Sequence, residues 1–573
     1  MTPTKANKIL EKGVFTFLSF LLLLPLFIIP SSAHASTGIV NPNQVYSYKV
    51  MQRDIERLAE AYPDLISYQS LGKTKYGRDL WAVKLGRGES VLFLNGSHHA
   101  REWMTTSLLM KMIETYALAY TANTTISSYD VRSLLDSVTI WIVPMVNPDG
   151  VTLAQQGTAG LPANLANTLR RYNGNSSNFA RWKATMEGID LNRQYPAGWS
   201  TIRNSAATPW YQNYKGKQPA QAPEVQMMMA FTKQIDPEIT ISYHSSGEII
   251  FWHYRTPSQN VARDKSIATV LANLTGYSLV KPEKNPSGGG YKDWFVQTFG
   301  RPGFTIEIAD YAGERSVPLS KFGGIWSENR LVGLYTAKKS YDLWLEKQKV
   351  QYFEQPMDLL AGTPLYPNIG GGAATATASL APQKLTITAR KGDWVQVGAA
   401  EGSGWIHPSP GMLTVVEPLD ASADVPEVIQ TYRYPDAFAP KGPAISPQTV
   451  QVTGQSGEWL QIAAETGPLW IRGQGLELKA PLQNSEPGPE PAPAPEIQAP
   501  AGPAPENQAP AGPASETQAP AEPTPENQAP AEPTPVQPPP PADSTPEKAP
   551  DHAPQNPQEP VRGIVTVEGE IVP

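Results

Sequence analysis

The residues best suited to chemistry begin with a histidine and a glutamate three positions apart. His99 and Glu102 follow an apolar run at 91–94 and precede an apolar-periodic segment that begins at Met104. Zn²⁺ binds imidazole nitrogen and carboxylate oxygen together, and a catalytic zinc site keeps one position open for water. Many chains contain His-x-x-Glu by chance, so this pair alone fits either a metal site or an ordinary helix start.

Further groups of this kind lie at or inside apolar runs. His244 ends the run 239–243, and Glu307 lies within the run 303–308. A histidine at a strand end is often a hydrogen-bonded core residue, but a carboxylate inside an apolar strand is costly to bury unless it is paired or used. Acid, amide and guanidinium groups also gather in two loops, at 147–150 and 190–193. All of these groups are candidates for one site.

The elements that must position these residues alternate between strands and helices. Apolar runs predict strands at 80–85, 90–94, 138–143, 239–243 and 303–308. Helical spacing predicts helices at 48–62, 105–119, 223–234, 261–274, 294–298 and 326–347. This alternation favours an α/β domain around a largely buried mixed sheet. Ligands of open α/β sheets bind outside the carboxyl ends of the strands, so residues far apart in sequence are expected to meet there.

These segments, in this order, resemble the motifs of the zinc carboxypeptidase family. The matching stretches are His-Ala-Arg-Glu at 99–102, Asn-Pro-Asp-Gly at 147–150, Asp-Leu-Asn-Arg at 190–193, Tyr-His-Ser at 243–245 and Phe-Thr-Ile-Glu at 304–307. One such stretch is weak evidence, whereas five in order are specific. The resemblance covers about residues 45–345 and implies the mixed-sheet α/β fold of that family.

The resemblance implies a metal centre and a proton carrier. His99, Glu102 and His244 would be the ligands of one Zn²⁺ per catalytic domain. Asp190 would accept a hydrogen bond from the other ring nitrogen of His99. Glu307 would be the general base, which takes a proton from the attacking water and delivers it to the leaving amine. Together these roles imply a hydrolase that acts on peptide bonds.

The family also implies residues that hold the substrate. Asn192 and Arg193 would bind its free carboxylate, which a guanidinium does bidentately, and Arg101 resembles a further carboxylate-binding residue. Lys183 stands where the animal digestive members carry an arginine that stabilises the developing oxyanion. Arg181 is the alternative for that role. Lysine and arginine are not interchangeable, so the assignment stays open between the two.

Lys292 is expected to set specificity, because counting back from Glu307 puts it where the family forms its side-chain pocket. A lysine there favours a substrate with a negatively charged group, and a lysine turned to solvent is the alternative. The family's mobile tyrosine has no counterpart, since Tyr291 is near but not aligned. The stretch Gly-Gly-Gly-Tyr-Lys-Asp-Trp at 288–294, together with secretion and the repeats described below, resembles the bacterial γ-D-glutamyl-diaminopimelate peptidases.

The chain has 573 residues, which is too long for one domain. Residues 1–35 resemble a secretory signal peptide, with lysines before an apolar core at 14–29 and a final Ala-His-Ala cleavage site. An uncleaved membrane anchor is the alternative. The catalytic domain is expected at 45–350, and the mature chain is expected to have no transmembrane span.

Two β-rich repeats are expected at 360–418 and 425–480. A Gly-acid-Trp step and a second tryptophan occur in both copies, at Trp394 and Trp405 and at Trp459 and Trp470. The pattern resembles small bacterial SH3-like β-barrels, which often bind cell wall, and β spacers with tryptophan cores are the alternative. Residues 483–573 are rich in Pro, Ala and Glu and are expected to be disordered, because they cannot bury enough apolar surface.

We therefore expect a secreted zinc peptidase that hydrolyses peptidoglycan stem peptides at the γ-D-Glu–meso-diaminopimelate bond and contacts the cell wall through its repeats. One alternative is a general secreted metallocarboxypeptidase that prefers acidic C-terminal residues. Another is a non-catalytic cell-wall-binding protein. The net charge of −7 and the lack of a basic block argue against a nucleic-acid partner. The absence of cysteine excludes a disulfide framework.

Overall fold

The computed structural model describes residues 38–370, 375–400 and 402–482, which include the expected catalytic domain and both β-rich repeats. The chain divides into two units after Glu486, and the second lies outside the described residues. The expected signal peptide at 1–35 and the expected tail at 483–573 lie outside them too. Within the described ranges, no helix combines the length and the apolar character that crossing a bilayer requires.

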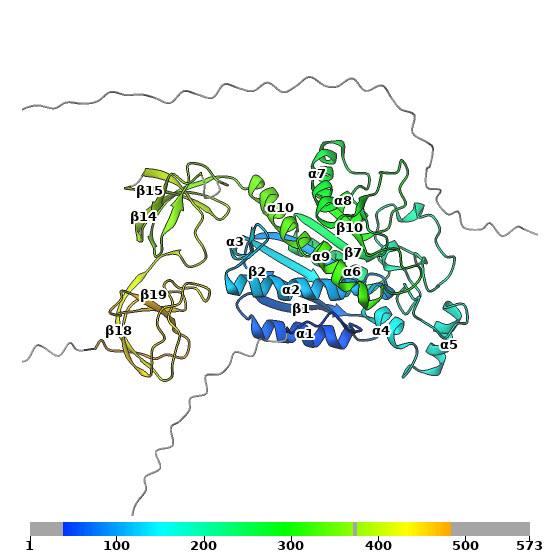
Figure 1. Cartoon of the computed structure of the whole chain (residues 1–573), viewed down its shortest axis with the longest axis horizontal. Coiled ribbons are helices and arrows are strands. Elements are labelled where there is room, and N and C mark those ends of the chain that lie inside the picture. Colours follow the sequence, from blue (N-terminus) through cyan, green and yellow to red (C-terminus); the bar gives the residue numbers. More distant parts are fainter. Residues whose placement is uncertain (1–37, 371–374, 401, 483–573) are drawn as a thin grey trace, which may run out of the picture. The chain divides into compact units, whose positions relative to one another are not determined.

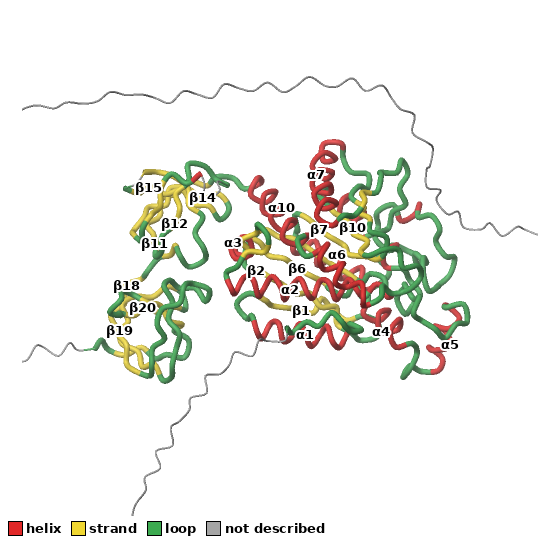
Figure 2. The backbone as a smooth tube through the Cα atoms, in the orientation of Figure 1, coloured by secondary structure: helices red, strands yellow, loops and turns green. Residues whose placement is uncertain are grey.

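An eight-stranded sheet forms the centre of the catalytic domain, in the order β1-β2-β6-β3-β7-β10-β8-β9 (Figures 1 and 2). The four middle strands are parallel to one another, and an antiparallel neighbour flanks them on either side. The mixed sheet expected from the apolar runs is therefore present. The strands are β1 (Ile66–Lys73), β2 (Asp79–Gly86), β3 (Ser90–Gly96), β6 (Val138–Val143), β7 (Ile239–Ser245), β8 (Ile249–Phe251), β9 (Ser278–Leu279) and β10 (Gly303–Ile308).

Helices cover both faces of this sheet. The larger set, α1, α2, α3, α7, α9 and α10, packs with Leu92 and Leu94 of β3, whereas α6 and α8 pack with Phe93 on the other face. Side chains of a strand alternate between faces, so a strand covered on both sides is apolar throughout. The helices are α1 (Tyr48–Ala61), α2 (Met104–Ala122), α3 (Val131–Ser137), α4 (Pro148–Gln156), α5 (Ala163–Tyr172), α6 (Pro223–Ile235), α7 (Ser258–Thr275), α8 (Tyr291–Phe299), α9 (Phe322–Asn329) and α10 (Val332–Lys347).

Two expected segments take another form, and the expectation drawn from sequence also lacks β1, β8, β9, α3 and α5. The single helix expected at 326–347 is two helices, α9 and α10, which a turn at Arg330 and Leu331 separates. The stretch 147–150, expected as a turn, is the start of α4, where the Asn147 side chain accepts a hydrogen bond from Gly150 N at 3.0 Å. Asparagine followed by proline is as common at a helix start as in a turn, so the local pattern was ambiguous.

Two five-stranded antiparallel sheets follow the catalytic domain, in the orders β16-β15-β14-β11-β17 and β21-β20-β19-β18-β22. Their matching strand orders show that the sequence repeat is also a structural repeat. Trp394, Trp459 and Trp470 are buried, but none of them belongs to the apolar clusters at the centres of the two sheets. The SH3-like assignment stays a prediction. The strands are β11 (Gln351–Leu359), β14 (Gln383–Lys391), β15 (Trp394–Ala399), β16 (Gly402–Ile406), β17 (Leu413–Thr414), β18 (Glu417–Val425), β19 (Gln448–Ser456), β20 (Trp459–Ile462), β21 (Leu469–Arg472) and β22 (Leu478–Lys479).

Candidate active site

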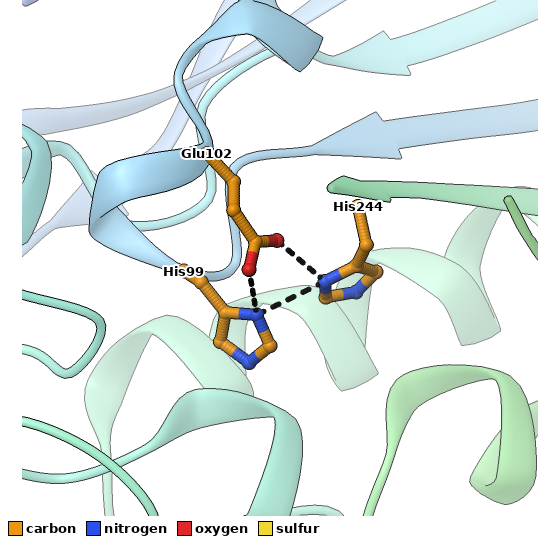
Figure 3. A group of neighbouring side chains, drawn as sticks. All are labelled: His99, Glu102 and His244. Atoms are coloured by element: carbon orange, nitrogen blue, oxygen red, sulfur yellow. Dashed lines mark hydrogen bonds and ion pairs between the residues drawn. The ribbon is translucent and has the colours of Figure 1, made fainter. Parts of the chain in front are cut away.

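Three side chains from two neighbouring strand ends converge on one point. His99 precedes the 3-10 turn η1 (Ala100–Glu102), which follows β3 after three residues, Glu102 is the last residue of that turn, and His244 lies in the adjacent strand β7. His99 Nδ1 lies 2.8 Å from Glu102 Oε1, and His244 Nδ1 lies 3.0 Å from Glu102 Oε2 (Figure 3). A 3-10 turn places side chains three positions apart on the same side, which explains the spacing of this pair.

This group fits a zinc ion. Its three ligand atoms lie within 4.8 Å of one another, and all three residues are buried. His99 Nδ1 and His244 Nδ1 lie 3.1 Å apart, and two ring nitrogens that face each other with lone pairs repel unless a proton or a shared cation lies between them. Two imidazoles and one carboxylate are a ligand set of catalytic zinc. The cofactor of this chain is therefore zinc.

Asp190 orients the first of these ligands. Its Oδ1 lies 3.2 Å from His99 Nε2, across the ring from Nδ1. A hydrogen bond from Nε2–H to this carboxylate leaves Nδ1 free of a proton and able to bind metal. Burial alone would raise the pKa of Asp190, but Lys183, His99 and Arg193 outweigh it and hold that pKa well below its ordinary value. The Asp190 carboxylate therefore keeps its charge across the working pH range.

Glu307 faces the same point from the next strand. In the parallel register of β7 and β10, Glu307 lies directly opposite His244, and paired strands are ~4.8 Å apart. Burial raises the pKa of Glu307 to about 7, although the charge of His244 opposes the rise. A carboxyl group with this pKa exchanges a proton readily near neutral pH, as a general base must.

A cavity of about 500 Å³ opens beside these residues. Its wall brings together most of the residues predicted for the site: His99, Lys183, Asp190, Asn192, Arg193, Lys292 and Glu307. Glu102 and His244 contact His99 directly. Arg101 does not line this cavity; its guanidinium donates to the Arg181 carbonyl oxygen at 3.1 Å, and its positive charge lowers the pKa of Glu307. The carboxylate-binding role of Arg101 stays a prediction.

Residues 51–330 match the model of the zinc carboxypeptidase family. A gamma-D-glutamyl-L-diamino acid endopeptidase of Lysinibacillus sphaericus is 35% identical over 304 residues, which cover 52% of this chain and 74% of that protein. The chain belongs to the zinc carboxypeptidase family. The uncharacterized protein YqgT of Bacillus subtilis is 29% identical over 52% of this zinc carboxypeptidase and 79% of its own length. The crystal structure of thrombin-activatable fibrinolysis inhibitor aligns with 52% of this chain and 75% of that chain, at 20% identity and a TM-score of 0.43.

The cation beside the metal centre of this zinc carboxypeptidase is Lys183 rather than Arg181. Lys183 lines the cavity, with its Nζ 3.4 Å from Asp190 Oδ2. Arg181 is held elsewhere, since its guanidinium donates to the Asn173 carbonyl oxygen at 2.7 Å and lies 4.0 Å from the centre of the Tyr211 ring. The position of Arg181 argues against the alternative in which it meets the oxyanion.

Asn192 and Arg193 share the short helix η2 (Leu191–Arg193), which Asp190 precedes as the N-cap residue. Arg193 donates to Asn213 Oδ1 at 3.1 Å, and its Nε forms an ion pair with Asp190 Oδ2 at 3.6 Å without a hydrogen bond. Arg193 also lines the cavity. The carboxylate-binding role that the family implies for Arg193 stays a prediction.

Lys292 is buried, with 8% of its side chain exposed, so the alternative of a lysine turned to solvent is wrong. Its ammonium group donates to the His253 carbonyl oxygen at 3.0 Å and lies 5.6 Å from the centre of the Tyr254 ring. Asp293, the next residue, also lines the cavity. Sequence reasoning missed His253, Tyr254 and Asp293, because adjacent residues on a helix do not face each other and nothing local tied them to Lys292.

Proposed function

We propose that this zinc carboxypeptidase is a secreted enzyme that hydrolyses peptidoglycan stem peptides at the γ-D-Glu–meso-diaminopimelate bond. The observation that carries the proposal is Lys292, a buried cation in the same cavity as His99 and Glu307. A stem peptide carries an extra carboxylate on its diaminopimelate side chain, which a buried ammonium prefers over apolar or basic groups. The similarity to a gamma-D-glutamyl-L-diamino acid endopeptidase supports the same substrate class.

In the proposed reaction, each residue of the cavity has a separate role in hydrolysis. Bound zinc supplies a Lewis acid, which makes water nucleophilic near neutral pH. Glu307 accepts the proton that the attacking water loses and delivers it to the leaving amine. Lys183 places positive charge beside the carbonyl oxygen as that oxygen becomes negative. Asp190 keeps its histidine partner in the metal-binding tautomer, and Arg193 holds a carboxylate of the substrate.

Digestion of purified muropeptides, followed by mass spectrometry, tests the proposal. We expect the zinc-loaded enzyme to release diaminopimelate-containing fragments from L-Ala-γ-D-Glu-meso-diaminopimelate, and Glu307→Gln to release none. Rapid cleavage of simple peptides with acidic C-terminal residues, with the γ-D-glutamyl peptide left intact, would identify a general metallocarboxypeptidase. Binding to sacculi without cleavage of either substrate would identify a wall-binding protein.

Export and contact with the cell wall form the second part of the proposal. The lysines before the apolar core at 14–29 support export, and the two β sheets, whose strands lie within 351–414 and 417–479, support a role in wall attachment. Fractionation of cells that produce the full chain, followed by immunodetection, tests this part. We expect the chain in the wall and medium fractions, and its retention in the cytoplasm would overturn the proposal.

A further inference from the structure

A charged pair lies in the cavity wall at the start of α8. Lys292 Nζ is 2.7 Å from Asp293 Oδ1, and the two side chains are 8% and 12% exposed. Both residues line the same cavity as Glu307. Pairs this well shielded are costly to build, because two charges must leave water together. A buried pair in a cavity wall therefore calls for a functional reason beyond helix stability.

The pair lies within reach of the reacting centre. β8 runs antiparallel to β10, with Phe251 opposite Thr305, and Lys292 binds the carbonyl of His253 two residues further on. Thr305 lies two positions from Glu307 along the sheet, and His253 lies two more positions away in the same direction. A strand rises ~3.3 Å per residue, so the Lys292 ammonium lies on the order of 10 Å from Glu307 along the sheet. A side chain of several carbon atoms spans such a distance.

Both charged groups keep free hydrogen-bonding capacity. An ammonium has three donors, and Lys292 donates one hydrogen bond to the His253 carbonyl oxygen while it forms an ion pair with Asp293. The Asp293 carboxylate faces Lys292 through Oδ1 and accepts a hydrogen bond from Gly290 N on Oδ2 at 3.3 Å, which leaves lone pairs on both oxygens. One ammonium donor and at least one carboxylate acceptor therefore remain for a ligand.

The Tyr254 hydroxyl is a third polar group in the part of the cavity wall that contains Lys292 and Asp293. Tyr254 is almost fully buried, lines the cavity, and its hydroxyl has no hydrogen-bond partner among the described residues. A Cβ atom at Gly198 or at Gly288 would come within 2.4 Å of that hydroxyl, so glycine at both positions makes the room that it occupies. A buried hydroxyl without a partner is costly, and a ligand group would satisfy it.

The charges of Lys292 and Asp293 determine which charged groups a ligand must carry at this end of the cavity. A ligand with only a carboxylate would meet Asp293 as well as Lys292, and one with only an ammonium would meet Lys292 as well as Asp293. A like charge at close range costs several kcal/mol, on the order of what an opposite charge contributes. An amino-acid head, with ammonium and carboxylate on one carbon, pairs with both residues and repels neither.

We propose that Asp293, with Tyr254 beside it, is a specificity residue that binds the distal ammonium of the substrate while Lys292 binds the distal carboxylate. The inference rests on the proposed function and deepens it, because it names the feature that the pocket recognises. Meso-diaminopimelate ends in such an amino-acid head. L-lysine lacks the distal carboxylate, and L-2-aminopimelate lacks the distal amine, so the pocket should discriminate against both.

Three peptides of the form L-Ala-γ-D-Glu-X test this inference, with meso-diaminopimelate, L-2-aminopimelate or L-lysine as X. We expect the zinc-loaded enzyme to show kcat/KM about tenfold or more higher for the first peptide than for the other two, as one charge-assisted hydrogen bond provides. Asp293→Asn keeps an oxygen for Gly290 N and should erase the preference for diaminopimelate over aminopimelate. Lys292→Gln should lower kcat/KM for the diaminopimelate and aminopimelate peptides and leave kcat/KM for the lysine peptide unchanged.

Asp342→Asn is the matched control, because Asp342 also pairs with a neighbouring lysine, Lys339, at 3.0 Å but lies on α10 outside the cavity wall. It should leave all three rates unchanged. If Asp293→Asn lowers kcat/KM equally for the three peptides, or changes it for none of them, Asp293 only caps α8 and the inference is overturned. Equal rates of the parent enzyme on all three peptides would overturn it too, while leaving the proposed function intact.

Equilibrium binding of free meso-diaminopimelate, measured by calorimetry, separates the inference from the proposed function. If the enzyme cleaves no γ-D-glutamyl peptide but binds this amino acid more tightly than L-lysine, and Asp293→Asn removes the difference, the inference stands and the proposed function fails. If the enzyme neither cleaves the peptides nor distinguishes the two free amino acids, both are overturned.

Discussion

Two carboxyl groups beside the metal centre, Asp190 and Glu307, behave in opposite ways. Lys183, His99 and Arg193 hold the pKa of Asp190 well below its ordinary value despite burial. Burial raises the pKa of Glu307 to about 7, with smaller and opposing effects from its charged neighbours. The surroundings, rather than the residue type, thus make one group a fixed charge and the other a proton carrier.

Glu307→Gln should abolish most of the activity without loss of metal. A positioned general base contributes ~100- to 10,000-fold, so kcat/KM should fall by about that factor. Glutamine keeps the size of the side chain, and Glu307 is not one of the three grouped ligands, so zinc content measured by atomic emission should equal that of the parent enzyme. A variant that loses its zinc would show that Glu307 supports the metal instead.

The pH dependence of kcat/KM should reflect the ionisation of Glu307. Glu307 accepts a proton only when ionised, and its pKa is raised to about 7, so the working form is lost as pH falls through that value. We expect kcat/KM to drop about tenfold per pH unit on the acidic side and to level off on the alkaline side, at constant zinc occupancy. A profile that stays flat from about pH 5 to about pH 8 would assign the base to another residue.

Glu224 should make stability depend on pH. It lies in the first turn of α6, fully buried, and its Oε2 has no hydrogen-bond partner among the described residues. Burial raises the pKa of Glu224 from 4.5 to about 8. The folded chain then keeps a proton that the unfolded chain releases, so the stability present below pH 4.5 is lost progressively as pH rises to about 8.

Glu224→Gln tests this linkage, because glutamine mimics the protonated form at every pH. We expect the melting temperature of the variant to fall less between pH 5 and pH 8 than that of the parent, by scanning calorimetry, and to be the higher of the two near the alkaline end (roughly 1.4 kcal/mol per unit of pKa shift). Parallel curves for the two proteins would show that Glu224 does not hold the extra proton.

Among the secondary-structure elements, the parallel strands position the metal-binding group and Glu307, and α8 forms part of the pocket wall. Asn192 Oδ1 accepts a hydrogen bond from Tyr291 N at 3.0 Å, which joins η2 to the first residue of α8. The backbone before α8 also passes close to its surroundings, since a Cβ at Gly288 would meet the Ala197 carbonyl oxygen at 2.2 Å. The short helix η2 and the start of α8 are therefore held together by a hydrogen bond.

Gly288→Ala should disturb the pocket and spare the metal. The added methyl group would collide with backbone at Ala197 and with the Tyr254 hydroxyl, so we expect KM for the γ-D-glutamyl peptide to rise by tenfold or more, an effect on the order of 1.4 kcal/mol. Gly323→Ala is the control, because nothing lies within 4 Å of a Cβ there and alanine favours the helix α9. Equal kinetics for both variants would contradict the proposed packing.

The parallel strands and the zinc ligands were predictable from sequence because each follows from a local pattern. Apolar runs identified β3, β6, β7 and β10, and ordered motifs identified His99, Glu102, His244 and Glu307. The three-residue strand β8 has no periodicity to detect, and its position decides where Lys292 points. Likewise, only the folded chain shows that Lys183 reaches the cavity while Arg181 binds Asn173. Contacts of this kind depend on tertiary structure and leave no local pattern.

At the scale of the molecule, the metal site joins segments that are far apart in the chain. His99 and His244 are 145 residues apart in sequence, and their ring nitrogens are neighbours in the fold. A ligand that binds the folded chain and not the unfolded chain stabilises it in proportion to the logarithm of ligand concentration over its dissociation constant. Zinc should therefore contribute to stability as well as to activity.

Removal of zinc with a chelator should abolish activity and lower the melting temperature. At a free zinc concentration 1,000 times the dissociation constant the stabilisation is ~4 kcal/mol, so the shift should be several degrees. Added zinc should restore both properties. Glu307→Gln should show the same thermal shift as the parent, because its three metal ligands are intact. Full activity in excess chelator would contradict the metal-dependent reaction.

His244 and Glu307 occupy the same level of two hydrogen-bonded strands, so backbone spacing sets the distance between them. The Lys292 end of the cavity comes from other segments, α8 and the residues after β8. Substitutions that alter the choice of substrate therefore leave the geometry of proton transfer intact. Acceptance of a different substrate side chain therefore requires changes in α8 and in the residues after β8, and none in His244 or Glu307.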